Sequence, residues 1–294
     1  MKTFLIVFIL LPFSFFGQAP FSDSTLDAGI DNIYDVYQGL FGGGVVAFDY
    51  DNDGYEDLFI TGGQGQDVLY KNNGDTTFKD VTKESGLFKD RMIVTTGVSS
   101  ADVNKDGFID LFVTTIASQA DQSKKKKTLA PNLLYINNGD GTFTDFSSKY
   151  GIIKNNFSTS SSFGDINADG YPDLFVGNYF KNFYFEDSPF NTHNIALLNH
   201  YSINEEYETG DDQLFINVEG KYFKEVSDLL MDSGKGYGFG GVFTDFDNDN
   251  DLDLFIINDF GETSDEGTEE IDFSDQDSLG KCLKCDGQVF EHGI

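Results

Sequence analysis

Short apolar runs alternate with acidic turns along much of the chain, and the combination recurs. In the first copy the apolar residues 44–48 lead into the acidic residues 49–57, and the apolar residues 58–60 follow directly. The same pattern, D-x-[DN]-x-D-[GN]-x-x-D-L-F-[IV], starts again at Asp102, Asp165 and Asp245. Because apolar runs flank a short polar turn, each copy predicts a strand, a tight acidic loop and a second strand.

A second element follows each of the first three acidic loops. It begins Leu-Tyr-x-Asn-Asn-Gly, or a close variant, and continues to a phenylalanine, at residues 69–82, 134–145 and 214–226. Two apolar runs separated by a glycine turn predict a hairpin. One repeat therefore holds four antiparallel strands, which is the content of a propeller blade. We expect an all-β fold, a β-propeller of four-stranded antiparallel blades, with four blade repeats within residues 18–294.

The length of the repeats varies at one place only. The distance from a hairpin phenylalanine to the next acidic loop is nearly constant, whereas the distance from an acidic loop to its own hairpin is not. The extra residues form two predicted insertions, 118–131 and 179–212, between the second and third strands of a blade. Such connections lie on one rim of a propeller, where insertions are tolerated and often bind ligands.

Oxygen-bearing side chains occupy the first, third, fifth and ninth positions of each acidic loop. Alternate positions of a tight loop turn inward, and a glycine at the sixth position permits the bend. Carboxylate oxygens suit calcium, whereas magnesium demands near-octahedral geometry. An EF-hand is excluded, because its twelfth position is a glutamate and here that position is an apolar strand residue. An acidic turn without metal is the simpler alternative, since Asp, Asn and Gly all favour turns.

Each loop is expected to hold one calcium ion (Ca2+), about four in all, with the carbonyl of the seventh residue as an additional ligand. The loops are residues 49–57, 102–110, 165–173 and 245–253. The expected ligands are Asp49, Asp51, Asp53, Tyr55, Asp57, Asp102, Asn104, Asp106, Phe108, Asp110, Asp165, Asn167, Asp169, Tyr171, Asp173, Asp245, Asp247, Asp249, Asp251 and Asp253.

These motifs resemble the FG-GAP/VCBS repeat family. The likeness lies in Gly-Val-x-x-x-Asp-x-[Asp/Asn]-x-Asp-Gly-x-x-Asp-Leu followed by Leu-Tyr-x-Asn-Asn-Gly-Asp-Gly-Thr-Phe, and it covers about residues 21–294. The nearest members are of the secreted ASPIC/UnbV and cartilage-acidic-protein type, and integrin α-subunit propellers are more distant. The resemblance implies calcium in the blade loops of a propeller that is usually seven-bladed, with roles in adhesion and surface recognition. The fourth copy carries Asn250 where the family has glycine, and Asn also tolerates a positive φ.

The two ends of the chain suggest how the blades are completed. Residues 21–30 resemble residues 78–87, so residues 21–25 are expected to form an outer strand that has no inner strands before it. Either this strand pairs beside residues 281–285 in a small closed ring, or the chain is the first part of a longer propeller. We favour the longer propeller, because related rings usually have seven blades. An open arc would leave blade faces uncovered, and self-association through them is then expected.

The net charge excludes two classes of partner, and the first residues of the chain indicate export. Fifty acidic residues against 19 basic residues give a formal charge of -31, which repels nucleic acid and anionic lipid and attracts cations. Residues 1–17 read as a signal peptide, with Lys2 before an apolar run. That run, about 13 residues, is too short to cross a bilayer, which needs about 20. We expect a secreted or cell-surface protein without a transmembrane segment.

The leading functional interpretation is a recognition or adhesion module, not an enzyme, with structural calcium and an extracellular protein or glycan as its partner. A propeller-fold hydrolase or lyase, or a structural component of a surface or secretion assembly, is the alternative. Catalysis needs a nucleophile with a base, or tuned acids in a cleft. No motif surrounds the three histidines, which are His193, His200 and His292.

Three further features are assigned no function. The lysine run 124–127 reads as a solvated loop tip, although it could dock an anionic partner. The acidic segment 262–277 reads as a flexible loop. Cys282 and Cys285 form a lone C-x-x-C, interpreted as a local disulfide or two free thiols, because a zinc site would need a second ligand pair.

Overall fold

The computed structural model describes residues 22–35, 42–87, 93–118, 129–181 and 209–258. Within these ranges the regular structure is β, apart from one 3-10 helix, η3 (Ser227–Gly234). The predicted all-β class is thereby confirmed. The predicted signal peptide, the lysine run, the histidines, the acidic segment and the two cysteines lie outside the described residues.

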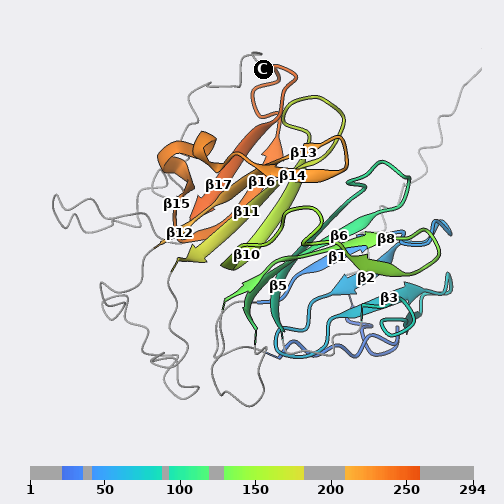
Figure 1. The fold of residues 1–294 in the computed structure, drawn as a ribbon. Coiled ribbons are helices and arrows are strands. Elements are labelled where there is room, and N and C mark those ends of the chain that lie inside the picture. Colours follow the sequence, from blue (N-terminus) through green and yellow to red (C-terminus); the bar gives the residue numbers. More distant parts are fainter. Residues whose placement is uncertain (1–21, 36–41, 88–92, 119–128, 182–208, 259–294) are drawn as a thin grey trace, which may run out of the picture.

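The first two acidic loops each belong to a four-stranded antiparallel sheet, as the repeat predicted, and the third belongs to a sheet of five strands, four of which are those of the repeat. The first sheet has the order β1 (Val45–Phe48), β2 (Asp57–Ile60), β3 (Val68–Asn72) and β4 (Phe78–Asp80). The second consists of β5 (Ile93–Ala101), β6 (Asp110–Ser118), β8 (Leu133–Asn137) and β9 (Phe143–Asp145). The third contains β10 (Asn155–Gly164), β11 (Asp173–Phe180), β13 (Gln213–Val218) and β14 (Tyr222–Glu225). In Figure 1 the sheets follow one another in chain order, from blue to orange.

The fourth sheet is described only for the two strands that flank its acidic loop, β16 (Gly238–Thr244) and β17 (Asp253–Asn258). A short strand lies at the C-terminal end of each predicted insertion, and each pairs with a strand that follows it in the chain. These strands are β7 (Ala130–Pro131), which pairs with β10, and β12 (Gly210–Asp211), which pairs with β15 (Lys235–Gly236). The middles of the insertions, residues 119–128 and 182–208, lie outside the described residues.

Neighbouring sheets stack through one apolar position of each second strand. The phenylalanine of the repeated Asp-Leu-Phe sequence is buried in the first three sheets, as Phe59, Phe112 and Phe175. Phe59 shares a cluster with Leu111 and Val113 of the next sheet, and Phe163 meets the Phe112 ring edge-on at a centroid distance of 6.3 Å. Burying one such side chain stabilises the fold by about 1.5–3 kcal/mol. The interfaces between sheets therefore form the core.

A turn with one hydrogen-bond pattern recurs at residues 24–30, 81–87 and 146–152. In each turn a carbonyl oxygen accepts the N–H that opens the outer strand of the following sheet. The pairs are Ala28 with Phe78 (2.8 Å), Ser85 with Phe143 (2.8 Å) and Tyr150 with Phe223 (2.9 Å). Residues 22–25, expected in an outer strand, instead enter the first of these turns, so the likeness to residues 78–87 comes from the connection. Residues 21 and 281–285 lie outside the described part.

In each of the first three sheets, a buried polar residue directly precedes the third strand. Asp67, Asn132 and Asp212 accept a backbone N–H from the end of the second strand, from Gly62 (2.8 Å), Thr115 (2.9 Å) and Asn178 (2.7 Å) respectively. Asn132 also donates to the Ser158 hydroxyl at 3.0 Å. The second oxygen of Asp212, Oδ2, is buried without a hydrogen-bond partner, and burial raises the pKa of this carboxyl to about 7.

The raised pKa of Asp212 predicts a pH-dependent stability. Between the unfolded value near 3.8 and the folded value of about 7, the folded chain holds one proton more than the unfolded chain. The associated stabilisation is therefore full below pH 4 and is lost at about 1.4 kcal/mol per pH unit as the pH rises to 7. Asp212→Asn keeps the acceptor without a charge. The melting temperature of this variant minus that of the unmodified chain should increase from pH 4 to 7 and should stay constant above pH 8.

The second blade offers the reciprocal substitution for the same measurement. Asn132→Asp places a carboxyl at a position that is 2% exposed. The backbone N–H of Thr115 donates to this position, as that of Asn178 does to Asp212. This variant should lose stability relative to the unmodified chain as the pH rises. A melting-temperature difference that does not change with pH in either variant would show that Asp212 is not a buried proton-binding group.

Candidate metal centres

The four acidic loops have one backbone geometry. The first-position aspartate accepts the N–H groups of the fifth and sixth residues, which in the first loop are Asp53 (3.0 Å) and Gly54 (2.7 Å). The same two hydrogen bonds occur at Asp102, Asp165 and Asp245, at 2.7–3.2 Å. The loops therefore fold as one motif, as their sequence similarity predicted.

Two positions of each loop have a left-handed backbone. The sixth residue has φ of 89° in Gly54 and 76° in Asn250, so asparagine supports the same bend in the fourth loop. The fourth position is also left-handed, with φ of 55–64°, in Asn52, Lys105, Ala168 and Asn248. Only the sixth position was expected from the sequence.

The ninth-position aspartate joins each loop to its sheet. Asp57, Asp110 and Asp173 are fully buried, and their Oδ2 atoms accept the N–H of the second loop residue at 3.0 Å. Their Oδ1 atoms accept the N–H of an asparagine on the third strand, at 2.7 Å from Asn72 and at 2.8 Å from Asn137 and Asn217. Burial raises the pKa of Asp57, and it raises the pKa of Asp110 and of Asp173 to about 7. Neighbouring carboxylates add to each rise, so a bound cation would relieve the unfavourable charge.

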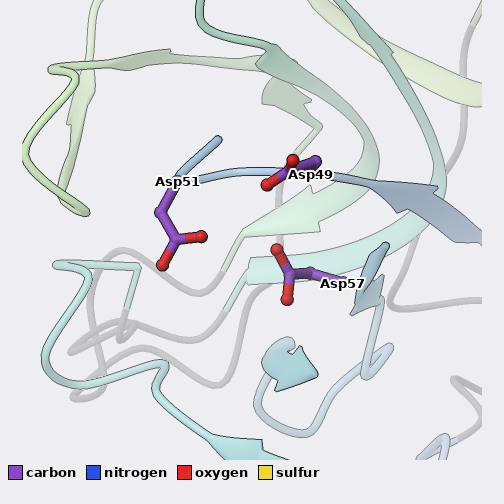
Figure 2. A group of neighbouring side chains, drawn as sticks. All are labelled: Asp49, Asp51 and Asp57. Carbon is purple, nitrogen blue, oxygen red and sulfur yellow. The ribbon is translucent and has the colours of Figure 1, made fainter. Parts of the chain in front are cut away.

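In the first loop three carboxylates converge. Asp49, Asp51 and Asp57 each offer an oxygen within 4.8 Å of the other two, and Figure 2 shows these side chains gathered around one space. Asp51 Oδ1 is buried without a hydrogen-bond partner. An oxygen-only donor set with an unpartnered buried oxygen fits a hard cation such as calcium.

Asp53, the fifth residue, lies outside this group of three and faces a lysine. The Lys71 ammonium, from β3, contacts Oδ2 of Asp51 and lies 2.6 Å from Oδ2 of Asp53. It also lies 5.5 Å from the centre of the Tyr50 ring. The hydrogen bond from Lys71 lowers the pKa of Asp53. The chain thus supplies one positive charge at the edge of the first loop.

The fourth loop brings together Asp245, Asp247 and Asp253, again with oxygens within 4.8 Å of one another. Asp249 and Asp251 lie outside that group, and the N–H of Asp251 donates to Asp249 Oδ1 at 3.1 Å. The hydrogen bond with Asp249 and the neighbouring carboxylates raise the pKa of Asp251 to about 6. Two acidic clusters that could hold a metal ion are thus present in the described residues.

The second and third loops carry asparagine at the third position, and the structure brings no three carboxylates together there. The amide of Asn104 donates to Asp106 Oδ2 at 2.8 Å, and that of Asn167 donates to Asp169 Oδ2 at 3.1 Å. Each of these two loops thus has one carboxylate fewer at the expected ligand positions than the first loop. The backbone geometry nevertheless matches that of the two clusters.

The side chains at the seventh position turn toward the hairpins. A Cβ atom at Gly74 would lie 2.7 Å from the Tyr55 ring, and one at Gly139 would lie 2.7 Å from the Phe108 ring. Tyr171 contacts Gly220 in the same way in the third blade. The glycine of each hairpin turn therefore leaves room for the aromatic residue of its own loop. The fourth loop has Asp251 at this position and no such aromatic contact.

Two asparagines that were not predicted as functional form hydrogen bonds with the acidic loop of the preceding blade as well as with the loop of their own blade. The Asn137 amide donates to the carbonyl oxygens of Tyr50 (2.8 Å) and Ile109 (3.2 Å), which belong to the first and second loops. Asn217 does the same for Val103 (2.8 Å) and Pro172 (3.2 Å). The signal in the sequence was the first asparagine of each Leu-Tyr-x-Asn-like element.

Antiparallel four-stranded sheets stacked in chain order, each with an acidic loop between its first two strands, define a repeat protein of the β-propeller class. The FG-GAP-like repeat family matches residues 49–113 and 116–176. The chain thus carries FG-GAP-like repeats, and the resemblance seen in its motifs is confirmed. No curated protein matches the chain in a sequence comparison. Across the described residues, no helix has the length and apolar character needed to cross a membrane.

Replacing Asn137 by alanine should lower the free energy of unfolding by about 1–3 kcal/mol, because two carbonyl oxygens lose their buried donor. Thermal or urea unfolding measures the loss. Asn138→Ala is the matched control, since the side chain of this exposed neighbour forms hydrogen bonds with Thr142 and Thr144 within its own hairpin. The control should change stability by less than about 0.5 kcal/mol. Equal losses in the two variants would contradict the role given to Asn137.

Proposed function

We propose that the chain is an exported recognition or adhesion propeller whose acidic loops bind calcium as structural ions. The observation that carries the proposal is the convergence of Asp49, Asp51 and Asp57 around one space, with a buried oxygen of Asp51 left unpartnered. Three carboxylates so close together repel one another, and a divalent cation would turn that repulsion into attraction. The fourth loop repeats the arrangement.

Calcium suits these loops better than other cations. The donors are carboxylate, amide and carbonyl oxygens, and the described parts of the loops contain no histidine or cysteine that would select a softer metal. Calcium accepts six to eight oxygen ligands in flexible geometry. In the first loop Asp49, Asp51 and Asp57 would hold the ion, with Lys71 left on the outer oxygens of Asp51 and Asp53. An extracellular medium, where calcium is abundant, would keep such loops occupied.

The repetition of the loops favours a binding module over an enzyme. A catalytic site places different groups in one cleft, whereas here one arrangement recurs in four loops that share their backbone hydrogen bonds. Structural ions would stiffen the loop end of each blade. The connections of variable length would then supply the surface that recognises an extracellular protein or glycan. A propeller-fold hydrolase or lyase remains the competing function, and turnover of a glycan substrate would favour it.

Calcium removal should lower stability. For a dissociation constant 100-fold below the calcium concentration, mass action contributes about 2.7 kcal/mol per occupied loop. Excess EDTA should therefore lower the melting temperature by several degrees, and added calcium should restore it. Magnesium at the same concentration serves as the control and should restore much less. A melting curve that is unchanged after verified metal removal would refute structural calcium.

A pair of neighbouring substitutions tests the ligand assignment. Asp51→Ala removes the unpartnered oxygen from the first cluster and should abolish calcium binding at that loop, which reduces the stoichiometry in a calorimetric titration by one ion. Glu56→Ala removes the same charge from an exposed side chain of the same loop. The Glu56 variant should keep the full stoichiometry. A loss of one ion in both variants, or in neither, would contradict the assignment.

A further inference from the structure

A lysine lies beside the first acidic loop at a position where the second and third blades carry an apolar residue. Lys71 directly precedes the asparagine of β3 whose N–H donates to the ninth loop residue. The residues that precede the equivalent asparagines in the second and third blades are Ile136 and Ile216. An isoleucine side chain neither donates a hydrogen bond nor carries a charge. Among these three blades, the ammonium group is therefore specific to the first.

The Lys71 ammonium takes the place that an asparagine amide has in the next two loops. It donates to Oδ2 of the fifth loop residue, Asp53, at 2.6 Å. In the second and third loops the donor to the fifth residue is the amide of the third residue, Asn104 at 2.8 Å and Asn167 at 3.1 Å. The third residue of the first loop is Asp51, which has no amide, and its Oδ2 also accepts from Lys71. The lysine thus supplies the donor that the first loop lacks.

The lysine also balances the charge of the first loop. At the first, third, fifth and ninth positions this loop has four aspartates, whereas the second and third loops each have three aspartates and one asparagine. The positive charge of Lys71 offsets the additional carboxylate. The side chains of Lys71, Asp51 and Asp53 are 27%, 24% and 33% exposed. Because charges that are partly shielded from water interact more strongly than fully exposed ones, the ammonium acts on both carboxylates.

We propose that Lys71 is a tethered counter-ion that lowers the calcium affinity of the first loop. The inference rests on the calcium binding proposed above and names the residue that tunes it. An ion held by Asp49, Asp51 and Asp57 (Figure 2) would share Asp51 with the ammonium and would be repelled by its positive charge. The same ammonium holds Asp53 outside the group of three, so a further carboxylate is withheld from the ion. When the ion leaves, the ammonium still compensates part of the negative charge.

Calorimetric titration of calcium into the metal-stripped full chain tests the effect on affinity. Lys71→Ile installs the residue of the second and third blades and should lower the dissociation constant of one site by about tenfold. This tightened site should vanish when Asp51→Ala is added. Lys79→Ile is the matched control, because it removes the same charge from the exposed cross-strand partner of Lys71 on β4. The control should change each dissociation constant by less than about twofold, since water and salt screen an exposed charge.

The outcomes of this titration separate the role of Lys71 from calcium binding itself. Calcium binding whose affinity is unchanged in Lys71→Ile would overturn the inference and leave the calcium function intact. An equal tightening in Lys79→Ile would also overturn it, because the effect would then come from net charge alone. An unmodified chain that binds no calcium would refute the calcium function, and the inference with it.

A second measurement needs no calcium. In excess EDTA, Lys71→Ile should lower the melting temperature, because Asp51 and Asp53 lose the charge that offsets their repulsion. Adding Asp51→Asn gives the first loop the residue types of the second loop at its ligand positions and should restore most of the loss. Packing of the lysine stem alone would not be restored in this way. A loss of the same size with and without Asp51→Asn, or no loss at all, would contradict the counter-ion role.

Discussion

A buried carboxylate at the ninth position of each of the first three acidic loops is the interaction on which these blades depend. Asp57, Asp110 and Asp173 accept one N–H from the loop and one from the third strand, so the loop, the second strand and the hairpin share one anchor. Burying a charge is costly unless it is hydrogen-bonded or paired. The same aspartate therefore holds the loop in shape and makes the loop end of the blade attractive to cations.

Neighbouring blades are coupled at two levels. At the loop end, Asn137 and Asn217 reach back to carbonyl groups of the preceding loop, so the position of one loop constrains the next. In the middle of the sheets, the phenylalanines of the first three Asp-Leu-Phe sequences are buried against the following blade. A disturbance in one loop can thus pass to the adjacent blade through a hydrogen bond and through side-chain packing.

The strands, hairpins and loop motif could be predicted because their signals are local. Alternating apolar runs, glycine turns and the spacing of Asp49, Asp51, Asp53 and Asp57 lie within short windows of the chain. The left-handed backbone of Lys105 and Ala168 could not be foreseen, since neither residue type favours it. Two further features depend on contacts between residues that are distant in the sequence, and a local sequence pattern does not reveal such contacts. They are the approach of Lys71 to Asp51 and Asp53, and the burial of Asp212.

The use of equivalent residue positions at the blade interfaces also affects how the number of repeats can change during evolution. The second and third sheets each carry both halves of the blade interface, one on each face. A tandem duplication of one repeat in the gene therefore inserts a blade that finds a matching surface on either side. Because no partner surface must evolve anew, the number of repeats can change in single genetic steps, and the geometry of the finished ring becomes what selection acts on.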